Sequence, residues 1–131
     1  MAQTGALIFG AAFLLFGVLG LFVHNGMGME ADNETTGKLL GLFPVNLLHN
    51  IVHLAFGVWG IVASRSHAAS RSYGRIGAVI YAVLVVMAFV DDTTFGLVPI
   101  GGNDIWLHAV LAAGLAYIGF AARDTMAHAH V

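Results

Sequence analysis

The chain contains no cysteine among its 131 residues. This absence excludes disulfide bonds, thiolate-ligated iron–sulfur clusters and covalently attached c-type haem. Charged side chains are also scarce, at 9% of the sequence, against about 25% in a typical soluble domain. With five basic residues and a formal net charge of −2, the composition does not indicate nucleic-acid binding. Any bound metal would need histidine, carboxylate or amide ligands.

Hydrophobic residues, in contrast, make up 59% of the chain, and the mean hydropathy is +0.87, as expected for an integral membrane protein. Four apolar stretches are each long enough, at roughly 18–20 residues, to cross the hydrocarbon core. They cover about residues 4–23, 46–64, 74–90 and 105–122. The first lacks the basic start and the cleavage site of a signal peptide, so we expect a retained span. The sequence therefore predicts one all-α domain, an integral membrane four-helix bundle.

The basic residues predict the orientation of this bundle. Arg65, Arg71 and Arg75 flank the short loop between the second and third spans, and Arg123 follows the fourth span. Only Lys38 lies in the long first loop, among acidic residues. By the positive-inside rule, both termini are expected in the cytoplasm, and the loops 25–45 and 91–104 on the outer side.

The two outer loops resemble each other and predict an internal repeat. Gly41–His49 reads GLFPVNLLH, and Gly96–His108 reads GLVPIGGNDIWLH. Both follow the order Gly-Leu-x-Pro-aliphatic, then Asn, then Leu-His. Gly60 follows His49 by eleven residues, as Gly119 follows His108. We infer two pseudo-repeated helical hairpins, related by an axis along the membrane normal, which would place His49 and His108 at equivalent positions.

Polar residues gather at the outer ends of the second and fourth spans. On the second span they follow the spacing i, i+3, i+4, i+7, which is one face of a helix: Asn46, His49, Asn50 and His53. The fourth span begins with Asn103, Asp104 and His108, of which the last two share a face. An ionisable group in a span costs about 2.5–3.5 kcal/mol on insertion scales, so these groups should face a partner or a cavity.

Several kinds of site fit this pattern. His49 and His53 form an H-x-x-x-H pair whose imidazoles can reach one metal ion, with His108 and Asp104 as further ligands from the facing helix. Haem b would need one histidine from each of two helices, and a chlorophyll-type pigment would need only one. The glutamate of the zinc-protease motif H-E-x-x-H is replaced by Asn50, which excludes that peptidase chemistry.

The alternative is a purely structural role. Asn46, Asn50, Asp104 and the histidines could brace the second and fourth spans by hydrogen bonds. In the ligand interpretation, Asn46, Asn50 and Asn103 would instead support the ligating side chains. A proton or ion path is a third idea, but the cytoplasmic halves of the spans have few notable polar tips, namely Ser64, Tyr73, Tyr81 and Tyr117. His24, Asp91 and Asp92 lie at span ends, where polar residues are normal, and no nucleophile–base pair or phosphate loop indicates an enzyme.

At NLLHNIVHLAFG and NDIWLH the chain resembles a family of small bacterial four-span membrane proteins catalogued as domain of unknown function 4383. The family's N-x-x-H-N-x-x-H-x-x-x-G stretch is matched at Asn46, His49, Asn50, His53 and Gly57. Its second stretch resembles D-N-x-L-H, where this chain has Asn103-Asp104 and one more residue before Trp106. The resemblance covers most of the chain. It implies a fold and a membrane location, and it implies no activity.

We therefore predict a membrane protein that binds a metal ion or haem near the outer face through His49, His53 and His108. The rival prediction is a non-catalytic structural or accessory subunit of a membrane complex, including a pigment-binding one. We expect a bacterial inner or photosynthetic membrane as the location. The expected partners are the lipid bilayer and either further copies of the chain or a larger membrane complex.

Overall fold

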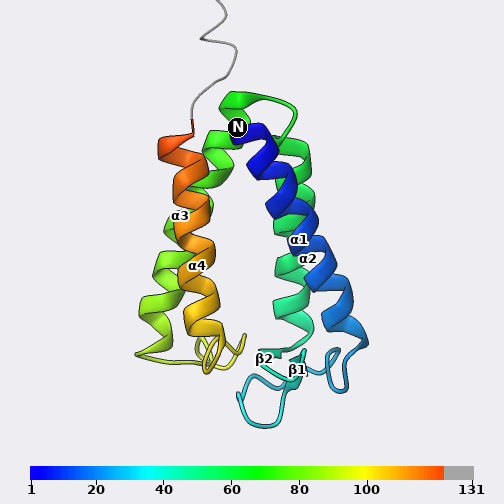
Figure 1. Cartoon of the computed structure of the whole chain (residues 1–131). Coiled ribbons are helices and arrows are strands. Elements are labelled where there is room, and N and C mark those ends of the chain that lie inside the picture. The colour runs from blue at the N-terminus through cyan, green and yellow to red at the C-terminus, as the bar shows by residue number, and fades with distance from the viewer. Residues whose placement is uncertain (123–131) are drawn as a thin grey trace, which may run out of the picture.

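A computed structural model describes residues 1–122, and the chain is mostly helical over this range (Figure 1). The helices and strands are α1 (Ala2–Phe22), β1 (Gly37–Leu39), β2 (Phe43–Val45), α2 (Leu47–Ala63), α3 (His67–Ala88) and α4 (Asp104–Ala116). A π-helical turn, Tyr117–Ala121, extends α4. Arg123 and the tail histidines His128 and His130, which form an H-x-H pattern, lie outside the described residues.

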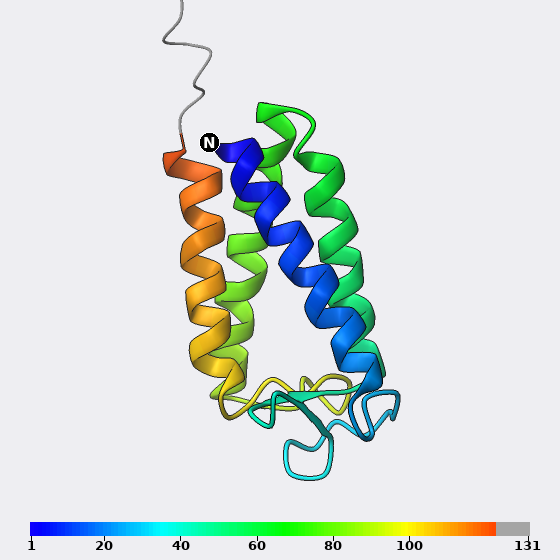
Figure 2. The ribbon, with the colours of Figure 1, turned by 45° about the vertical axis from the view of Figure 1, so that its right-hand side comes forward.

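The four helices form two pairs. Helix α1 packs mainly on α2, and α3 mainly on α4. The N-terminus, the α2–α3 turn and the end of α4 lie at one end of the molecule, called here the terminal end (Figures 1 and 2). The two long loops lie at the other end, the loop end. The pairs converge at the terminal end and diverge toward the loop end (Figure 1).

Three helical segments are long and apolar enough to cross a membrane: Ala2–Phe22, His67–Ala88 and Asp104–Ala121. These lengths and compositions indicate a membrane protein. Helix α2 is also apolar but has 17 residues, so it is the shortest of the expected spans. Helix α3 begins seven residues before the expected 74, because the Ser66 side chain accepts a hydrogen bond from the backbone N of Ala69 and caps the helix there.

Glycines allow the helices of each pair to touch through their backbones. A Cβ atom on Gly10 of α1 would lie 2.7 Å from the backbone N of Ile61 in α2. In the other pair, a Cβ on Gly74 of α3 would lie 2.5 Å from the backbone N of Gly119. Only glycine fits such close approaches, which replace side-chain packing with direct backbone contact. Arg71 and Arg75 donate through Nε to the carbonyl oxygen of Gly119, at 3.0 and 2.8 Å.

An aromatic core joins the two pairs. Phe13 of α1 lies 5.5 Å from Phe56 of α2 and 5.6 Å from Tyr81 of α3, measured between ring centroids. Tyr73 of α3 donates to the carbonyl oxygen of Phe56 at 3.1 Å. Trp59 of α2 packs inward, 4.8 Å from the Tyr73 ring. Its partly buried indole therefore belongs to this core.

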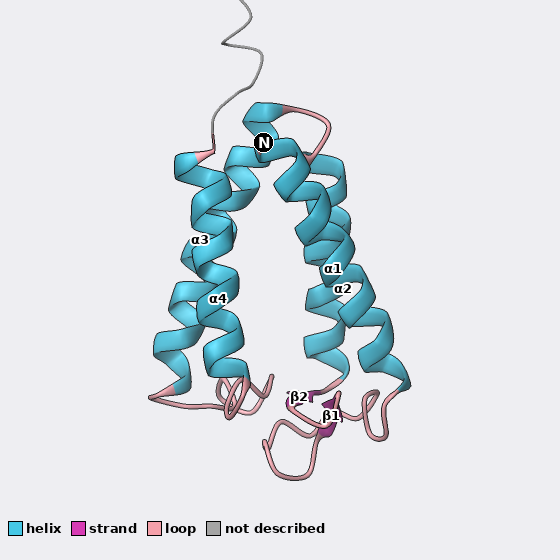
Figure 3. Cartoon of the chain, in the orientation of Figure 1, coloured by secondary structure: helices cyan, strands magenta, loops and turns pink. Residues whose placement is uncertain are grey.

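The loop end contains the part of the fold that an all-α prediction misses. Strands β1 and β2 pair antiparallel, Leu39 opposite Phe43, in the loop after α1 (Figure 3). Leu40 and Gly41 in the turn have positive φ, at 57° and 71°. Phe95 and Gly96 repeat this pair of left-handed residues in the second loop, at 59° and 84°. The two loops thus share a backbone feature just before their prolines.

Candidate metal site

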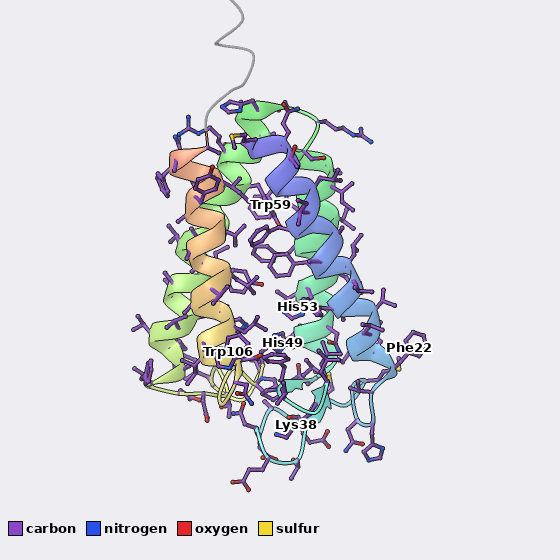
Figure 4. The ribbon with its side chains drawn as sticks, in the orientation of Figure 1. Phe22, Lys38, His49, His53, Trp59 and Trp106 are labelled. Carbon is purple, nitrogen blue, oxygen red and sulfur yellow. The ribbon has the colours of Figure 1, made fainter. Side chains whose placement is uncertain are left out.

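Three histidines meet near the loop end of the bundle. His49 and His53 lie one turn apart on α2, and His108 reaches them from α4 (Figure 4 shows the first two). The ring centroids of His49 and His53 are 4.4 Å apart, and those of His49 and His108 are 6.0 Å apart. One nitrogen from each of the three rings lies within 4.8 Å of the other two. All three side chains are buried.

Asp104 completes the cluster from the first turn of α4. Its side chain is only 2% exposed, and its Oδ2 lies 3.9 Å from Nδ1 of His49. Because Asp104 and His108 are four residues apart, they project from the same face of α4 toward α2. The structure thus brings together all four side chains that the sequence suggests as ligands.

One nitrogen of each imidazole and one oxygen of the Asp104 carboxylate lack a hydrogen-bond partner among the described residues. Within residues 1–122, Nδ1 of His49, His53 and His108 and Oδ2 of Asp104 are each buried without one. Buried polar groups in native proteins are almost always hydrogen-bonded, and each exception needs an explanation. Four such atoms on neighbouring side chains make the cluster a candidate site for a cation.

Two of the asparagines expected to support the ligands are buried and make hydrogen bonds to the loops. Asn46 caps α2 by accepting from the backbone N of His49 at 2.8 Å, and its Nδ2 donates to the carbonyl oxygens of Glu30 and Leu97. Asn50 donates to the carbonyl oxygen of Gly26 at 2.9 Å.

Asn103 is exposed and does not join the cluster. It donates to the carbonyl oxygen of Leu42 and accepts from Nε1 of Trp106. It therefore fastens the two loops at the surface, away from the imidazoles. The sequence places Asn103 beside Asp104, but consecutive residues point to different sides of a helix start.

Aromatic side chains enclose the imidazoles on the terminal side. The Tyr81 ring packs edge-on against His108, with centroids 5.1 Å apart, and Phe13 lies 5.7 Å from His53. In the sequence, Tyr81 is only a polar tip of the third span, and the pattern assigns no role to Phe13. A signal for Tyr81 exists, because it is a phenol in the middle of an otherwise aliphatic span.

Both proline loops reach the cluster from the loop side. The backbones of Pro44 and Pro99, the equivalent prolines of the two loops, lie close to the His49 imidazole. Pro44 and Pro99 are themselves fully buried. The histidines are thus covered by the loops on one side and by the aromatic core on the other.

The weaker sequence candidates lie apart from the cluster. His24 is exposed after α1. Asp91 follows α3, where its Oδ1 accepts hydrogen bonds from the hydroxyl and the backbone N of Thr93. These hydrogen bonds, the hydroxyl one first, lower the pKa of Asp91 from its usual 3.8. The backbone carbonyl of Asp92 accepts from Asn33 at 3.0 Å. Both aspartates organise the second loop.

Comparison with known families confirms the resemblance drawn from the two histidine stretches. The model of a family described as "Domain of unknown function (DUF4383)" matches residues 3–121. The chain belongs to this family. No curated protein and no solved structure matches this chain. Family membership therefore supplies no ligand for the cluster, and only the geometry of the cluster indicates one.

Proposed function

We propose that this protein binds one transition-metal ion, with Zn²⁺ as the reference case, in the membrane. His49, His53 and His108 are the proposed nitrogen ligands, and Asp104 is the proposed oxygen ligand. The observation that carries the proposal is the set of four buried atoms without hydrogen-bond partners on these side chains. A bound cation would satisfy all four at once. Binding by nitrogen and carboxylate ligands without thiolates also suits Zn²⁺ and the neighbouring divalent metals.

The distances fit an ion after small side-chain rotations. Ligand nitrogens at about 2.0–2.1 Å from a tetrahedral zinc ion lie about 3.3 Å from one another. The three imidazole nitrogens are already within 4.8 Å of one another. Rotations about χ1 and χ2 of these side chains would have to close the difference. The His49–Asp104 distance of 3.9 Å is similarly close to that of two ligands on one ion.

Haem b is a weaker candidate for this geometry. A bis-histidine haem needs two imidazoles on opposite faces of the porphyrin, with open space around the iron in the porphyrin plane. His49 has the His53 ring beside it at 4.4 Å and the His108 ring at 6.0 Å. The third imidazole would occupy space that the macrocycle needs. Three converging imidazoles and a carboxylate favour a bare ion.

The bracing role is carried by other residues. Asn46, Asn50 and Asn33 all make hydrogen bonds that fasten loops to helices or to each other. The unpaired nitrogens of the three histidines make none with the described residues. This division of roles supports a ligand-binding cluster over a purely structural network.

The arrangement in the membrane is part of the same proposal. Arg65, Arg71 and Arg75 lie at the terminal end, which supports a cytoplasmic position for both termini. The metal cluster would then lie near the outer face. The paired positive-φ residues before Pro44 and Pro99 support the interpretation of the hairpins as two repeats.

Metal analysis of the purified protein tests the proposal. The protein is produced in a bacterial membrane, reconstituted in nanodiscs, and measured for bound metals by mass spectrometry and for a Soret band by absorption. We expect about one divalent ion per chain and its loss in His49→Ala and His108→Ala. His24→Ala and His67→Ala remove histidines outside the cluster and should keep the ion. Equal metal content in all four variants, or none in the parent protein, would overturn the proposal, and a Soret band would replace the ion by haem.

A further inference from the structure

Two arginine side chains of α3 meet at the end of α4. Nε of Arg71 and Nε of Arg75 both donate to the carbonyl oxygen of Gly119, at 3.0 and 2.8 Å. Arg71 also donates through Nη2 to the carbonyl oxygen of Phe120 at 3.3 Å. The Arg75 guanidinium lies over the Phe120 ring, 5.4 Å from its centroid. Because both arginines bind one oxygen atom, their two positive charges are held side by side.

The π-helical turn Tyr117–Ala121 supplies the groups that hold this arginine pair. A Cβ atom on Gly119 would lie 2.5 Å from the backbone N of Arg75, so only glycine lets the turn approach α3 this closely. The close approach allows both arginines to reach the same carbonyl group. Single π-helical turns are rare and occur frequently at functional sites.

The arginine pair has no carboxylate partner among residues 1–122. The aspartates and glutamates of this range all lie at the loop end, namely Glu30, Asp32, Glu34, Asp91, Asp92 and Asp104. A guanidinium group has five N–H donors. The backbone carbonyls of α4 and its π-helical turn take two of them from Arg71 and one from Arg75. The other donors can bind an anion, and the planar fork of a guanidinium matches a phosphate group.

An apolar groove begins one helical turn from this pair. Val79 follows Arg75 by four residues, about 6 Å along the same face of α3. From there the groove extends along α3 to the second loop, with a volume of about 500 Å³. Its wall is entirely apolar and consists of Val79, Ala82, Val83, Val86, Met87, Val90 and Phe95. One face of α3 therefore carries two guanidinium groups and then a groove for a hydrocarbon chain.

This order matches the layers of a bilayer. Arg71 and Arg75 lie on either side of residue 74, where the third apolar span is expected to begin. Tyr117, in the π-helical turn, is 52% exposed, and exposed tyrosines are enriched at the membrane–water interface. The arginines would thus lie at the level of the lipid head groups and the groove in the hydrocarbon layer.

We propose that Arg71 and Arg75 bind the phosphate group of an anionic phospholipid, one of whose acyl chains lies in the groove from Val79 to Phe95. The charge pair selects the head group, and the groove adds affinity for the chain. A zwitterionic lipid is disfavoured, because its head group would bring a cation close to two guanidinium groups. This site is independent of the proposed metal ion, which would lie toward the opposite end of the molecule (Figure 1).

Native mass spectrometry of the detergent-purified protein tests the proposal. Phosphatidylglycerol and phosphatidylcholine with identical acyl chains are added in equal amounts. We expect the first bound lipid to be phosphatidylglycerol roughly ten times more often, since each basic residue near the membrane surface favours an anionic lipid. Equal binding of the two lipids would overturn the proposal.

A soluble phosphate ester tests the contribution of the groove. Glycerol 3-phosphate carries the phosphate group without acyl chains and should bind far more weakly than phosphatidylglycerol. Binding as tight as that of the lipid would overturn the proposal, because the site would then be one for a soluble anion.

Matched variants locate the head-group site. Arg75→Gln removes one charge of the pair and should lower the preference for phosphatidylglycerol about threefold. Arg65→Gln removes one charge from the exposed turn between α2 and α3 and should leave the preference unchanged. Arg75→Lys keeps the charge and should keep part of the preference. An equal loss in Arg75→Gln and Arg65→Gln would assign the preference to the overall charge of the terminal end and refute the site.

A second pair of variants locates the acyl chain. Val83 and Val110 are 55% and 60% exposed on α3 and α4. Val83→Trp fills the groove and should weaken the binding of both lipids, while their ratio stays the same. Val110→Trp makes the same change outside the groove and should alter neither. If Val83→Trp binds phosphatidylglycerol as well as the parent protein does, the groove is wrongly assigned.

Discussion

At the terminal end of the bundle the helices touch through glycine, whereas at the loop end the two pairs are separated by a layer of polar side chains. Gly10 and Gly74 place backbone against backbone at the first end. His49, His53 and His108 fill the space between the pairs at the second. The first arrangement satisfies its polar groups through Ser70 and Tyr73. Within residues 1–122 the second leaves six buried side-chain polar atoms unpaired, four of them in the metal cluster and the others on Thr36 and Asn50. The terminal end is therefore packed closely, and the loop end is where the proposed metal ion would bind.

The largest effect is expected where the backbones touch. Gly74→Leu would force α3 and α4 apart, because a Cβ there already lies 2.5 Å from the backbone N of Gly119. We expect a loss above about 3 kcal/mol, at the upper end for overpacked sites, since no flexible side chain can yield. Thermal unfolding in detergent measures it. Ala109→Leu adds the same side chain at an exposed position of α4 and should change the melting temperature little.

The second prediction addresses the loop end through the ion. Saturating Zn²⁺ should raise stability by about 2.7 kcal/mol when the free ion is at about 100 times its Kd. Without metal, Asp104→Asn should leave the protein equally or more stable, because it removes a buried carboxylate that lacks a partner. With metal, the same variant should lose most of the gain. Melting curves of the parent protein and of Asp104→Asn, with zinc and with a chelator, measure both effects. A lower melting temperature of Asp104→Asn than of the parent protein in chelator would contradict the prediction.

A smaller effect is expected for the asparagine that joins the two loops. Asn46→Ala removes the cap of α2 and two side-chain hydrogen bonds to loop carbonyls. We expect a cost of about 1–2 kcal/mol. Asn103→Ala, at the exposed start of α4, should cost no more than about 0.5 kcal/mol. Chemical unfolding of the two variants would show whether buried and exposed asparagines differ as the hydrogen bonds indicate.

The smallest effect concerns pH. The hydrogen bond from the Thr93 hydroxyl helps to hold the pKa of Asp91 below its usual 3.8. A carboxyl whose folded-state pKa is lowered stabilises the fold above its unfolded pKa, and that contribution is lost as the pH falls through the folded pKa. Thr93→Val should therefore raise the pKa of Asp91 toward 3.8. An NMR titration of the carboxyl measures it, and an unchanged pKa would assign the shift to the backbone instead.

The helices and the cluster could be predicted from sequence because both depend on periodic patterns. Hydrophobic runs predict the four helices, and the i, i+4 spacing of His49 with His53 and of Asp104 with His108 predicts which faces meet. The expected repeat also predicts that His49 and His108 lie at one depth. None of this requires knowledge of how the loops fold.

The loop end was harder to predict because its structure depends on distant contacts. Strands β1 and β2 have three residues each, and the non-glycine residues Leu40 and Phe95 adopt positive φ, which local sequence does not favour. The roles of Asn46 and Asn50 depend on carbonyl groups from remote segments. Trp59 packs inward because Tyr73, from the next helix, offers its ring edge-on. Each of these outcomes is decided by tertiary neighbours.

Asn33 has a consequence for how quickly an ion could exchange with water. Its side chain donates to the carbonyl of Asp92 and accepts from the backbone N of Gly101, so it clamps the first loop onto the second. Asn46, at the start of α2, also holds the second loop, because its side chain donates a hydrogen bond to the carbonyl oxygen of Leu97. A hydrated ion arriving from the aqueous phase would have to wait until these bonds open together. Rates of loading and release would then be set by the opening of the loops, while the equilibrium affinity would be set by the imidazoles and the Asp104 carboxylate.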